Sequence, residues 1–318
     1  MLTRKTVGGT EPELAAMRRL NKVLARLPRF RISCQATRFA LQGLLKLGQL
    51  RGSAILARHG LRAEEKTVTV EGASVALRII HSGRPPKAVV LDIHGGGWVI
   101  GNAQMNDALN LGLIQACDVV VVSVDYRLAP ATTVEGQIRD CLTAARWLLD
   151  AGNPPFAELP VLLVGESAGA HLAAACLLEL KAWPALLQRV RGALLYYGVY
   201  DLTGTPSVRN AGPDTLVLDG PGIVAALRQL TPGLTDDRRR APPLSPLHGD
   251  LQGMPPALFV VGERDALFDD TVLMAQRWGE VAPAEVWVVR EAAHGFVHFG
   301  VGQRVIEGVW AWARQTLR

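Results

Sequence analysis

A serine between small residues is the first candidate for chemistry in this chain. The run Gly165-Glu166-Ser167-Ala168-Gly169 follows the apolar segment 162–164 and precedes an alanine-rich segment typical of a helix. Small residues beside a serine allow a sharp turn from strand to helix, which exposes the hydroxyl above the sheet. The context predicts a nucleophile elbow carrying Ser167. The pattern alone is weak, because a chain with 32 glycines in 318 residues contains it by chance roughly one time in ten.

The sequence after Ser167 contains an acid and a histidine that could activate the serine. A hydroxyl needs a base and a group that orients the base, and enzymes with such an elbow order them as nucleophile, acid, histidine. Asp265 follows the apolar run 258–261 closely, and His294 follows the run 286–289. A histidine in a loop just past a strand is suited to general-base catalysis. We therefore predict a triad of Ser167, Asp265 and His294.

Neighbouring acids and histidines fit other roles better. Asp269 and Asp270 stand where the next helix should begin, and carboxylates there satisfy free backbone amides. His298 already approaches the C-terminal helix, so it ranks below His294 as the base. His94 precedes Ser167 in the chain, so we interpret it as a residue that holds the adjacent glycine loop by hydrogen bonds. A catalytic role for His94 is the less favoured alternative.

A glycine loop offers donors for a negatively charged oxygen. Gly95, Gly96 and Gly97 follow the apolar run 88–93, and they lack the Cβ atoms that would keep a substrate away from their amides. An acyl-transfer enzyme needs such amides around the developing oxyanion. The amide of Ala168, directly after the nucleophile, should complete this oxyanion hole.

Aromatic residues near these loops are candidates for substrate contacts. Trp98 follows the glycine loop and could form a wall of the acyl site, although an ordinary core position explains it almost equally well. Tyr196, Tyr197 and Tyr200 lie at the end of an apolar run. We predict that Tyr197 contacts substrate, with ordinary packing as the alternative.

The elements that must position these residues follow from the periodicity. Short apolar runs separated by segments with helical patterns predict parallel strands buried on both faces. Two alternating runs ahead of them predict an antiparallel pair. The sequence therefore predicts an α/β fold whose mostly parallel sheet has about eight strands, with helices on both faces. The predicted strands cover residues 67–70, 75–80, 88–93, 119–124, 161–164, 192–197, 257–261 and 286–289.

Two further segments should cover the sheet edge that carries the chemistry. Residues 11–60 have apolar residues at helical spacing, interrupted by Pro28, and predict two helices. Almost 60 residues separate the strand ending near Val199 from the next one, far more than the roughly 2–6 of an ordinary connection. We expect one domain, residues 1–318, with a helical cap built from about 1–60 and about 200–250.

Composition narrows the class of protein. The net charge of +5 comes from scattered residues without a nucleic-acid motif, so we expect no nucleic-acid partner. No signal peptide or membrane-spanning run is found, which predicts a cytoplasmic protein without stable membrane insertion. A leucine stripe over 41–47 could bind lipid but fits the buried face of a cap helix better. The cysteines lack metal-binding spacing, and we interpret them as buried free thiols: Cys34, Cys117, Cys141 and Cys176.

The ordered motifs resemble the hormone-sensitive-lipase-like branch of the α/β-hydrolases, which includes bacterial carboxylesterases and arylacetamide-deacetylase relatives. The resemblance covers about residues 67–318 and rests on the HGGGW loop at 94–98, DYRLAP at 125–130, the elbow, Asp265 and His294. Two departures concern substrate preference and leave the triad intact. Glu166 stands where this branch most often has aspartate, and residues 131–134 lack the usual glutamate and prolines.

The resemblance implies a serine carboxylesterase that hydrolyses short- to medium-chain acyl esters through an acyl-enzyme, without metal or organic cofactor. The same machinery could cleave amides or lactones, so an amidase, deacetylase or lactonase is the nearest alternative. A binding protein without activity, like the plant hormone receptors of this superfamily, is less favoured because such proteins have lost the catalytic histidine and His294 is present. A homodimer is compatible with the family, but no interface follows from the sequence.

Overall fold

The structure is a computed structural model that describes all of residues 1–318 except 32–34, 50–51, 82, 151 and 153–155. A mixed sheet of nine strands forms its centre, in the order β1-β9-β8-β7-β6-β4-β5-β3-β2. The strands are β1 Leu2–Val7, β2 Arg62–Val70, β3 Ala73–His81, β4 Ala88–Ile93, β5 Val119–Asp125, β6 Val161–Glu166, β7 Val190–Tyr196, β8 Ala257–Gly262 and β9 Ala284–Val289. Strands β2 and β3 pair antiparallel at one edge, and the remaining strands run parallel from β5 to β1.

All eight predicted strands are present, and a ninth was missed. Strand β1 pairs in parallel with β9 along the other edge of the sheet. Its middle four residues, Thr3 to Thr6, are exposed, so its sequence has no apolar run that would predict a strand. Backbone hydrogen bonds to β9 hold it in place, and these do not depend on side-chain type.

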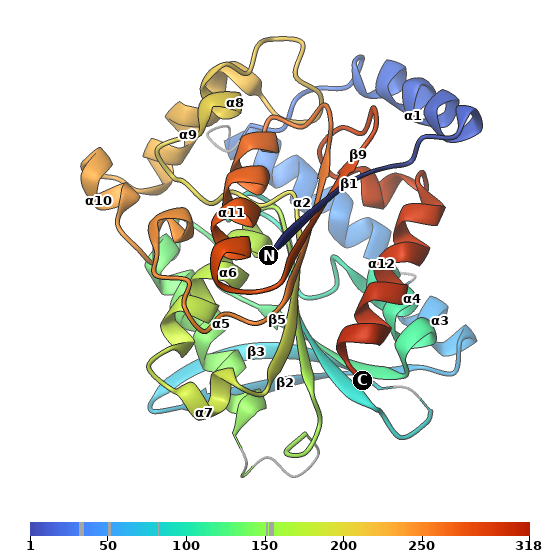
Figure 1. Ribbon diagram of the computed structural model, residues 1–318, viewed down its shortest axis with the longest axis vertical. Coiled ribbons are helices and arrows are strands. Elements are labelled where there is room, and N and C mark those ends of the chain that lie inside the picture. Colours follow the sequence, from blue (N-terminus) through green and yellow to red (C-terminus); the bar gives the residue numbers. More distant parts are fainter. Residues whose placement is uncertain (32–34, 50–51, 82, 151, 153–155) are drawn as a thin grey trace.

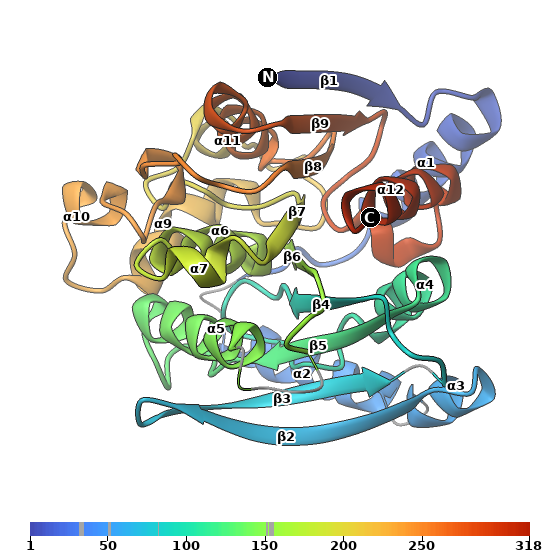
Figure 2. The same cartoon turned by 60° about the horizontal axis from the view of Figure 1, so that its bottom comes forward.

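Helices cover both faces of the sheet because alternate strand residues point to opposite sides. In β4, Val89 and Leu91 enter one apolar core, whereas Val90 enters the other. Figure 2 shows the first face covered by α5 (Val134–Leu149), α6 (Ala168–Leu180) and α11 (Phe268–Val281), and the opposite face by α4 (Asp107–Cys117) and α12 (Gln303–Thr316). The short helix α7 (Pro184–Leu187) follows α6.

The two segments expected to form a cap are helical. The described part of residues 11–60 forms three helices where the sequence predicted two: α1 (Glu11–Leu24), α2 (Gln35–Gln49) and the short α3 (Gly52–Arg58). The long connection after β7 contains α8 (Pro206–Arg209), α9 (Ile223–Leu230) and α10 (Asp236–Arg240). Figure 1 shows α1, α8 and α9 at the same end of the molecule. No helix in the described part of the chain has the length and apolar character needed to cross a bilayer.

The segments are joined directly. Phe30 donates its backbone N–H to the carbonyl of Val217 over 2.7 Å, and its own carbonyl accepts from the amide of Asp219 over 3.2 Å. Arg31 adds an ion pair to Asp219 at 3.1 Å. The N-terminal segment and the long connection are therefore held together by backbone hydrogen bonds and an ion pair.

The cysteines described by the structure carry free thiols. Cys117, Cys141 and Cys176 are buried and unpaired, as predicted. Cys34 lies outside the described residues.

Candidate active site

The turn from β6 into α6 places Ser167 at the carboxyl edge of the sheet. Ser167 has φ of 51°, a left-handed conformation that is unfavourable for a residue with a side chain. The turn is tight enough that glycine is required two residues before and two residues after Ser167, because neighbouring backbone leaves no room for a Cβ at either position. A Cβ on Gly165 would stand 2.5 Å from the carbonyl oxygen of Gly169, and one on Gly169 would overlap the carbonyl oxygen of Ile93. The predicted elbow is therefore present, and tight packing explains its two glycines.

The three residues predicted as a triad meet above this turn. His294 Nε2 lies 3.0 Å from Ser167 Oγ, and His294 Nδ1 lies 2.9 Å from Asp265 Oδ2. Asp265 follows β8 and His294 follows β9, and these strands are neighbours, so both loops reach the same point. Asp265 also accepts the amide of Leu267 over 2.9 Å, which fixes its carboxylate. Both residues are buried, so water competes little for these hydrogen bonds.

The glycine loop after β4 passes beside Ser167. Gly96 and Gly97 have φ of 100° and 57°, so both use backbone conformations that favour glycine. Among the described residues, no acceptor is found for the amides of Gly96, Gly97 and Ala168. The Gly95 amide instead faces Glu166 Oε1 at 3.4 Å. The backbone amides of Gly96, Gly97 and Ala168 are therefore free to donate to a substrate oxygen, whereas the amide of Gly95 faces the Glu166 carboxylate.

His94 supports the glycine loop, as the sequence indicated. Its Nδ1 lies 2.8 Å from the carbonyl oxygen of Gly95, and its ring stacks on Tyr126 with 4.2 Å between ring centroids. The Tyr126 hydroxyl donates to the carbonyls of His94 and Gly95 over 2.9 and 3.1 Å. Complete burial lowers the pKa of His94 to about 4, which keeps the ring neutral.

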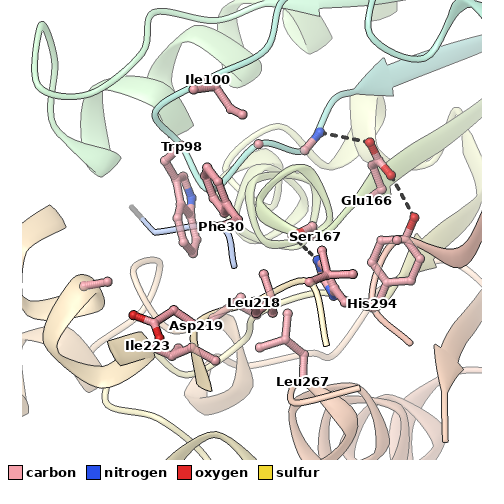
Figure 3. A pocket seen from close by; sticks show the side chains of 18 of the residues that line it. Phe30, Trp98, Ile100, Glu166, Ser167, Leu218, Asp219, Ile223, Leu267 and His294 are labelled. Atoms are coloured by element: carbon pink, nitrogen blue, oxygen red, sulfur yellow. Dashed lines mark hydrogen bonds between the residues drawn. The ribbon is translucent and has the colours of Figure 1, made fainter. Parts of the chain in front are cut away.

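Trp98 and Tyr197 both line the cavity at Ser167 (Figure 3 shows Trp98). Trp98 is almost fully buried, and its Nε1 donates to His171 Nδ1 over 3.2 Å. His171 Nε2 donates in turn to the carbonyl of Leu244 over 2.8 Å. Burial lowers the pKa of His171 to about 4, consistent with this neutral form. Tyr197 is the tyrosine of its cluster that lines this cavity, and Tyr196 and Tyr200 do not.

The cavity lies at the carboxyl ends of the strands, with a volume of about 260 Å³. Figure 3 shows Phe30 beside Trp98 on one side, with Ile223 and Leu267 across the space from them. The two segments expected to form a cap add apolar residues to this wall, and no local sequence pattern predicts that these residues line a cavity. They include Phe30, Leu41, Leu218, Ile223 and Leu227. Only their position within the predicted cap segments indicated a role.

Glu166 and His298 form an ion pair beside the nucleophile. His298 Nε2 lies 2.6 Å from Glu166 Oε2, so His298 is not positioned as a base for Ser167. Glu166 Oε2 also accepts the Tyr197 hydroxyl over 2.8 Å. Asp269 and Asp270 lie in the first turn of α11, as predicted. The expected capping of this helix is wrong, because Asp270 accepts the amides of Tyr200 and Asp201 and Asp269 accepts that of Ser207, all in the connection after β7.

A serine, histidine and aspartate with this geometry on this sheet define a serine hydrolase of the α/β-hydrolase fold. Comparison with known proteins agrees: a family model for the alpha/beta hydrolase fold matches residues 90–298. The chain is 32% identical to the carboxylesterase NlhH of Mycobacterium tuberculosis over 76% of its own length and 77% of that protein. It is 30% identical to an ethyl acetate hydrolase of Pseudomonas putida, covering 73% of this chain and 74% of that one.

A solved structure shows the same likeness along nearly the whole chain. The esterase LipW from Mycobacterium marinum superposes with a TM-score of 0.82 at 25% identity, covering 96% of this chain and 98% of that one. The chain therefore belongs to the hormone-sensitive-lipase-like family of α/β hydrolases, as its sequence motifs indicated.

Proposed function

We propose that this protein hydrolyses short- to medium-chain carboxylic esters through an acyl-enzyme intermediate on Ser167. As a member of its family, the protein is a carboxylesterase of the serine hydrolase class. The observation that carries the mechanism is the continuous hydrogen-bonded path from Ser167 through His294 to Asp265, with 3.0 and 2.9 Å between partners.

Each group then has one role in the reaction. His294 Nε2 accepts the Ser167 proton as Oγ attacks the ester carbonyl, and Asp265 stabilises and orients the imidazolium that forms. The amides of Gly96, Gly97 and Ala168 stabilise the oxyanion of the tetrahedral intermediate. His294 returns its proton to the leaving alcohol, which departs and leaves the acyl group on Ser167. His294 then activates a water molecule that releases the acid and restores the serine.

The cavity supports a limit on substrate size. Its volume of about 260 Å³ is below the roughly 300–1,000 Å³ of pockets that enclose drug-sized ligands. Its walls are mainly apolar, and Trp98 and Tyr197 contribute to them. One relative is named for hydrolysis of ethyl acetate, an ester with a two-carbon acyl group. These features favour short- to medium-chain acyl groups over long ones.

The covering segments complete the proposal. We propose that residues 1–318 form one domain in which about 1–60 and about 200–250 act as a cap over the ester site. The ion pair between Arg31 and Asp219 and the backbone bonds of Phe30 join the two segments at the cavity wall.

A graded panel of p-nitrophenyl esters, with matching p-nitroanilides, tests bond type and pocket depth together. We expect kcat/KM to be highest for acyl groups of short to medium length and much lower for anilides. Ser167→Ala should lower kcat by roughly 10⁶-fold, because the nucleophile acts together with its base. Wild-type turnover by Ser167→Ala, or rates that rise steadily beyond acyl chains of about twelve carbons, would contradict the proposal.

A further inference from the structure

The carboxylate of Glu166 connects the two loops that carry the catalytic groups. Glu166 ends strand β6 directly before the nucleophile, and its side chain is almost completely buried. Oε1 faces the Gly95 amide of the glycine loop at 3.4 Å, a long contact. Oε2 accepts the Tyr197 hydroxyl and lies 2.6 Å from His298 Nε2. Three chain segments therefore meet on one acidic group.

His298 belongs to the loop that carries the catalytic histidine. It lies four residues after His294, in the short 3₁₀ turn Phe296–Phe299. Its side chain is 30% exposed and lines the cavity. A bond from His298 to the elbow therefore fixes the distance between the His294 loop and Ser167.

Tyr197 extends the same network to the catalytic imidazole. The Tyr197 ring packs edge-on against His294, with 4.8 Å between ring centroids and 62° between planes. The hydrogen bond to Glu166 holds this ring in place. Glu166 thus supports His294 from two directions, through Tyr197 and through the His298 turn.

The charges of the pair stabilise each other. Burial by itself would raise the pKa of Glu166, but the charge and hydrogen bond of His298, the Tyr197 hydroxyl and the more distant His294 lower it to about 2. Burial by itself would lower the pKa of His298, but the Glu166 carboxylate, with Asp92 in support, raises it above its usual value. Each group of the pair therefore favours the charged form of the other.

Other titratable groups surround the pair on each neighbouring segment. The groups that interact electrostatically with Glu166 or His298 are Asp92 on β4, His94 after β4, Tyr126 after β5, Tyr196 and Tyr197 at the end of β7, and His294 after β9. Of these, His294 is the other imidazole, and its effect on the rate must be distinguished from that of His298 by experiment.

We propose that Glu166 and His298 are a charged positioning pair that holds the glycine loop and the His294 loop at the nucleophile, so that activity falls when His298 loses its proton. The inference rests on the proposed esterase function and adds residues that never touch the reacting atoms.

The direction of the pH effect follows from the ion pair. Because Glu166 raises the pKa of His298, the paired imidazolium persists to higher pH than an unpaired one and is lost as pH rises through that raised value. His294 acts in the opposite sense, since it must be neutral to accept the serine proton. The pH profile of kcat should therefore have an alkaline limb that belongs to His298.

Two substitutions at His298 separate charge from hydrogen bonding. His298→Gln keeps an amide donor that can reach Glu166 but does not titrate, whereas His298→Ala removes both properties. The matched control is His248→Gln, which removes another histidine–carboxylate pair, with Asp201 at 3.1 Å, outside the cavity lining. The assay is hydrolysis of p-nitrophenyl butyrate between pH 5 and 10, with about one measurement per half pH unit and with active sites counted by a fluorophosphonate probe.

We expect His298→Ala to lower kcat per labelled site about ten-fold with KM within about two-fold, because misplaced groups weaken transition-state binding selectively. His298→Gln should stay close to the His298→Ala value and lack the alkaline limb, because it restores a donor but not the charge, while His248→Gln keeps the wild-type profile. An alkaline limb retained in His298→Gln, or wild-type kcat per labelled site in His298→Ala, would overturn the inference. If His298→Ala does not fold, the His298→Gln profile decides alone. Wild-type protein without esterase activity would instead overturn the proposed function itself.

Discussion

Replacement of Gly169 by alanine tests how closely the elbow and the oxyanion loop are packed. Gly169 is the second residue of α6, and its Cα faces the end of β4, where the glycine loop begins. A Cβ placed there would stand 2.5 Å from the carbonyl oxygen of His94 and closer still to that of Ile93. Both obstacles are backbone atoms, so a side-chain rotation cannot relieve the overlap.

The size of the effect follows from the displacement required. Ordinary contacts between carbon and its neighbours begin near 3.5 Å, so the backbone must separate by roughly 1 to 1.5 Å. A displacement of this size in a catalytic group costs about 10²-fold in rate, equal to about 2.7 kcal/mol of transition-state stabilisation. Overpacking in the core should also lower the free energy of unfolding by about 1–3 kcal/mol.

The assay compares kcat/KM for p-nitrophenyl butyrate with the urea unfolding free energy of the same preparations. Gly43→Ala is the matched control, because Gly43 lies on α2 with no atom within 4 Å of the added Cβ. That variant should keep wild-type activity and gain up to about 1 kcal/mol of stability from helix propensity. Activity of Gly169→Ala within about two-fold of wild type would refute this account of the elbow.

Two further substitutions probe the core and the cavity. Asp270 is buried and accepts the amides of Tyr200 and Asp201, and burial still raises its pKa to about 7. The native state then binds more protons than the unfolded state above about pH 4, so this group lowers stability as pH rises from about 4 to 7. Asp270→Asn should flatten the pH dependence of the urea unfolding free energy between about pH 4 and 7. An unchanged slope would contradict the raised pKa of Asp270. Ile223→Ala removes part of the cavity wall and should raise the octanoate-to-butyrate ratio of kcat/KM roughly ten-fold; a constant ratio would exclude Ile223 from substrate contact.

The predictable part of the fold consisted of elements with strong local patterns. The central strands are apolar on both faces, so short runs such as 119–124 identify them without knowledge of their partners. Strand β1 has no such pattern, because an edge strand with exposed side chains is specified by backbone pairing to β9. Helix α3 was missed for a related reason: it has only seven residues, too few for a clear period.

The candidate site likewise has residues that the sequence could predict and contacts that it could not. Ser167, Asp265 and His294 could be chosen because chain order and position after a strand constrain them strongly. The partners of Glu166 could not, since Gly95, Tyr197 and His298 lie 71, 31 and 132 residues away in the chain. The prediction of Gly95 as an oxyanion donor failed because its amide faces Glu166, a contact between segments that are distant in the chain.

The sequence by itself identified the residues that we propose carry the chemistry: a serine at a glycine-flanked turn, an acid and a histidine after later strands, and a glycine loop before them. These signals are local, because each depends on backbone freedom or on the end of a strand. Only the tertiary structure decided which amides remain free, which residues from the covering segments enclose the cavity, and that Glu166 is paired with His298. Such contacts join distant segments, and their geometry depends on how the helices pack on the sheet.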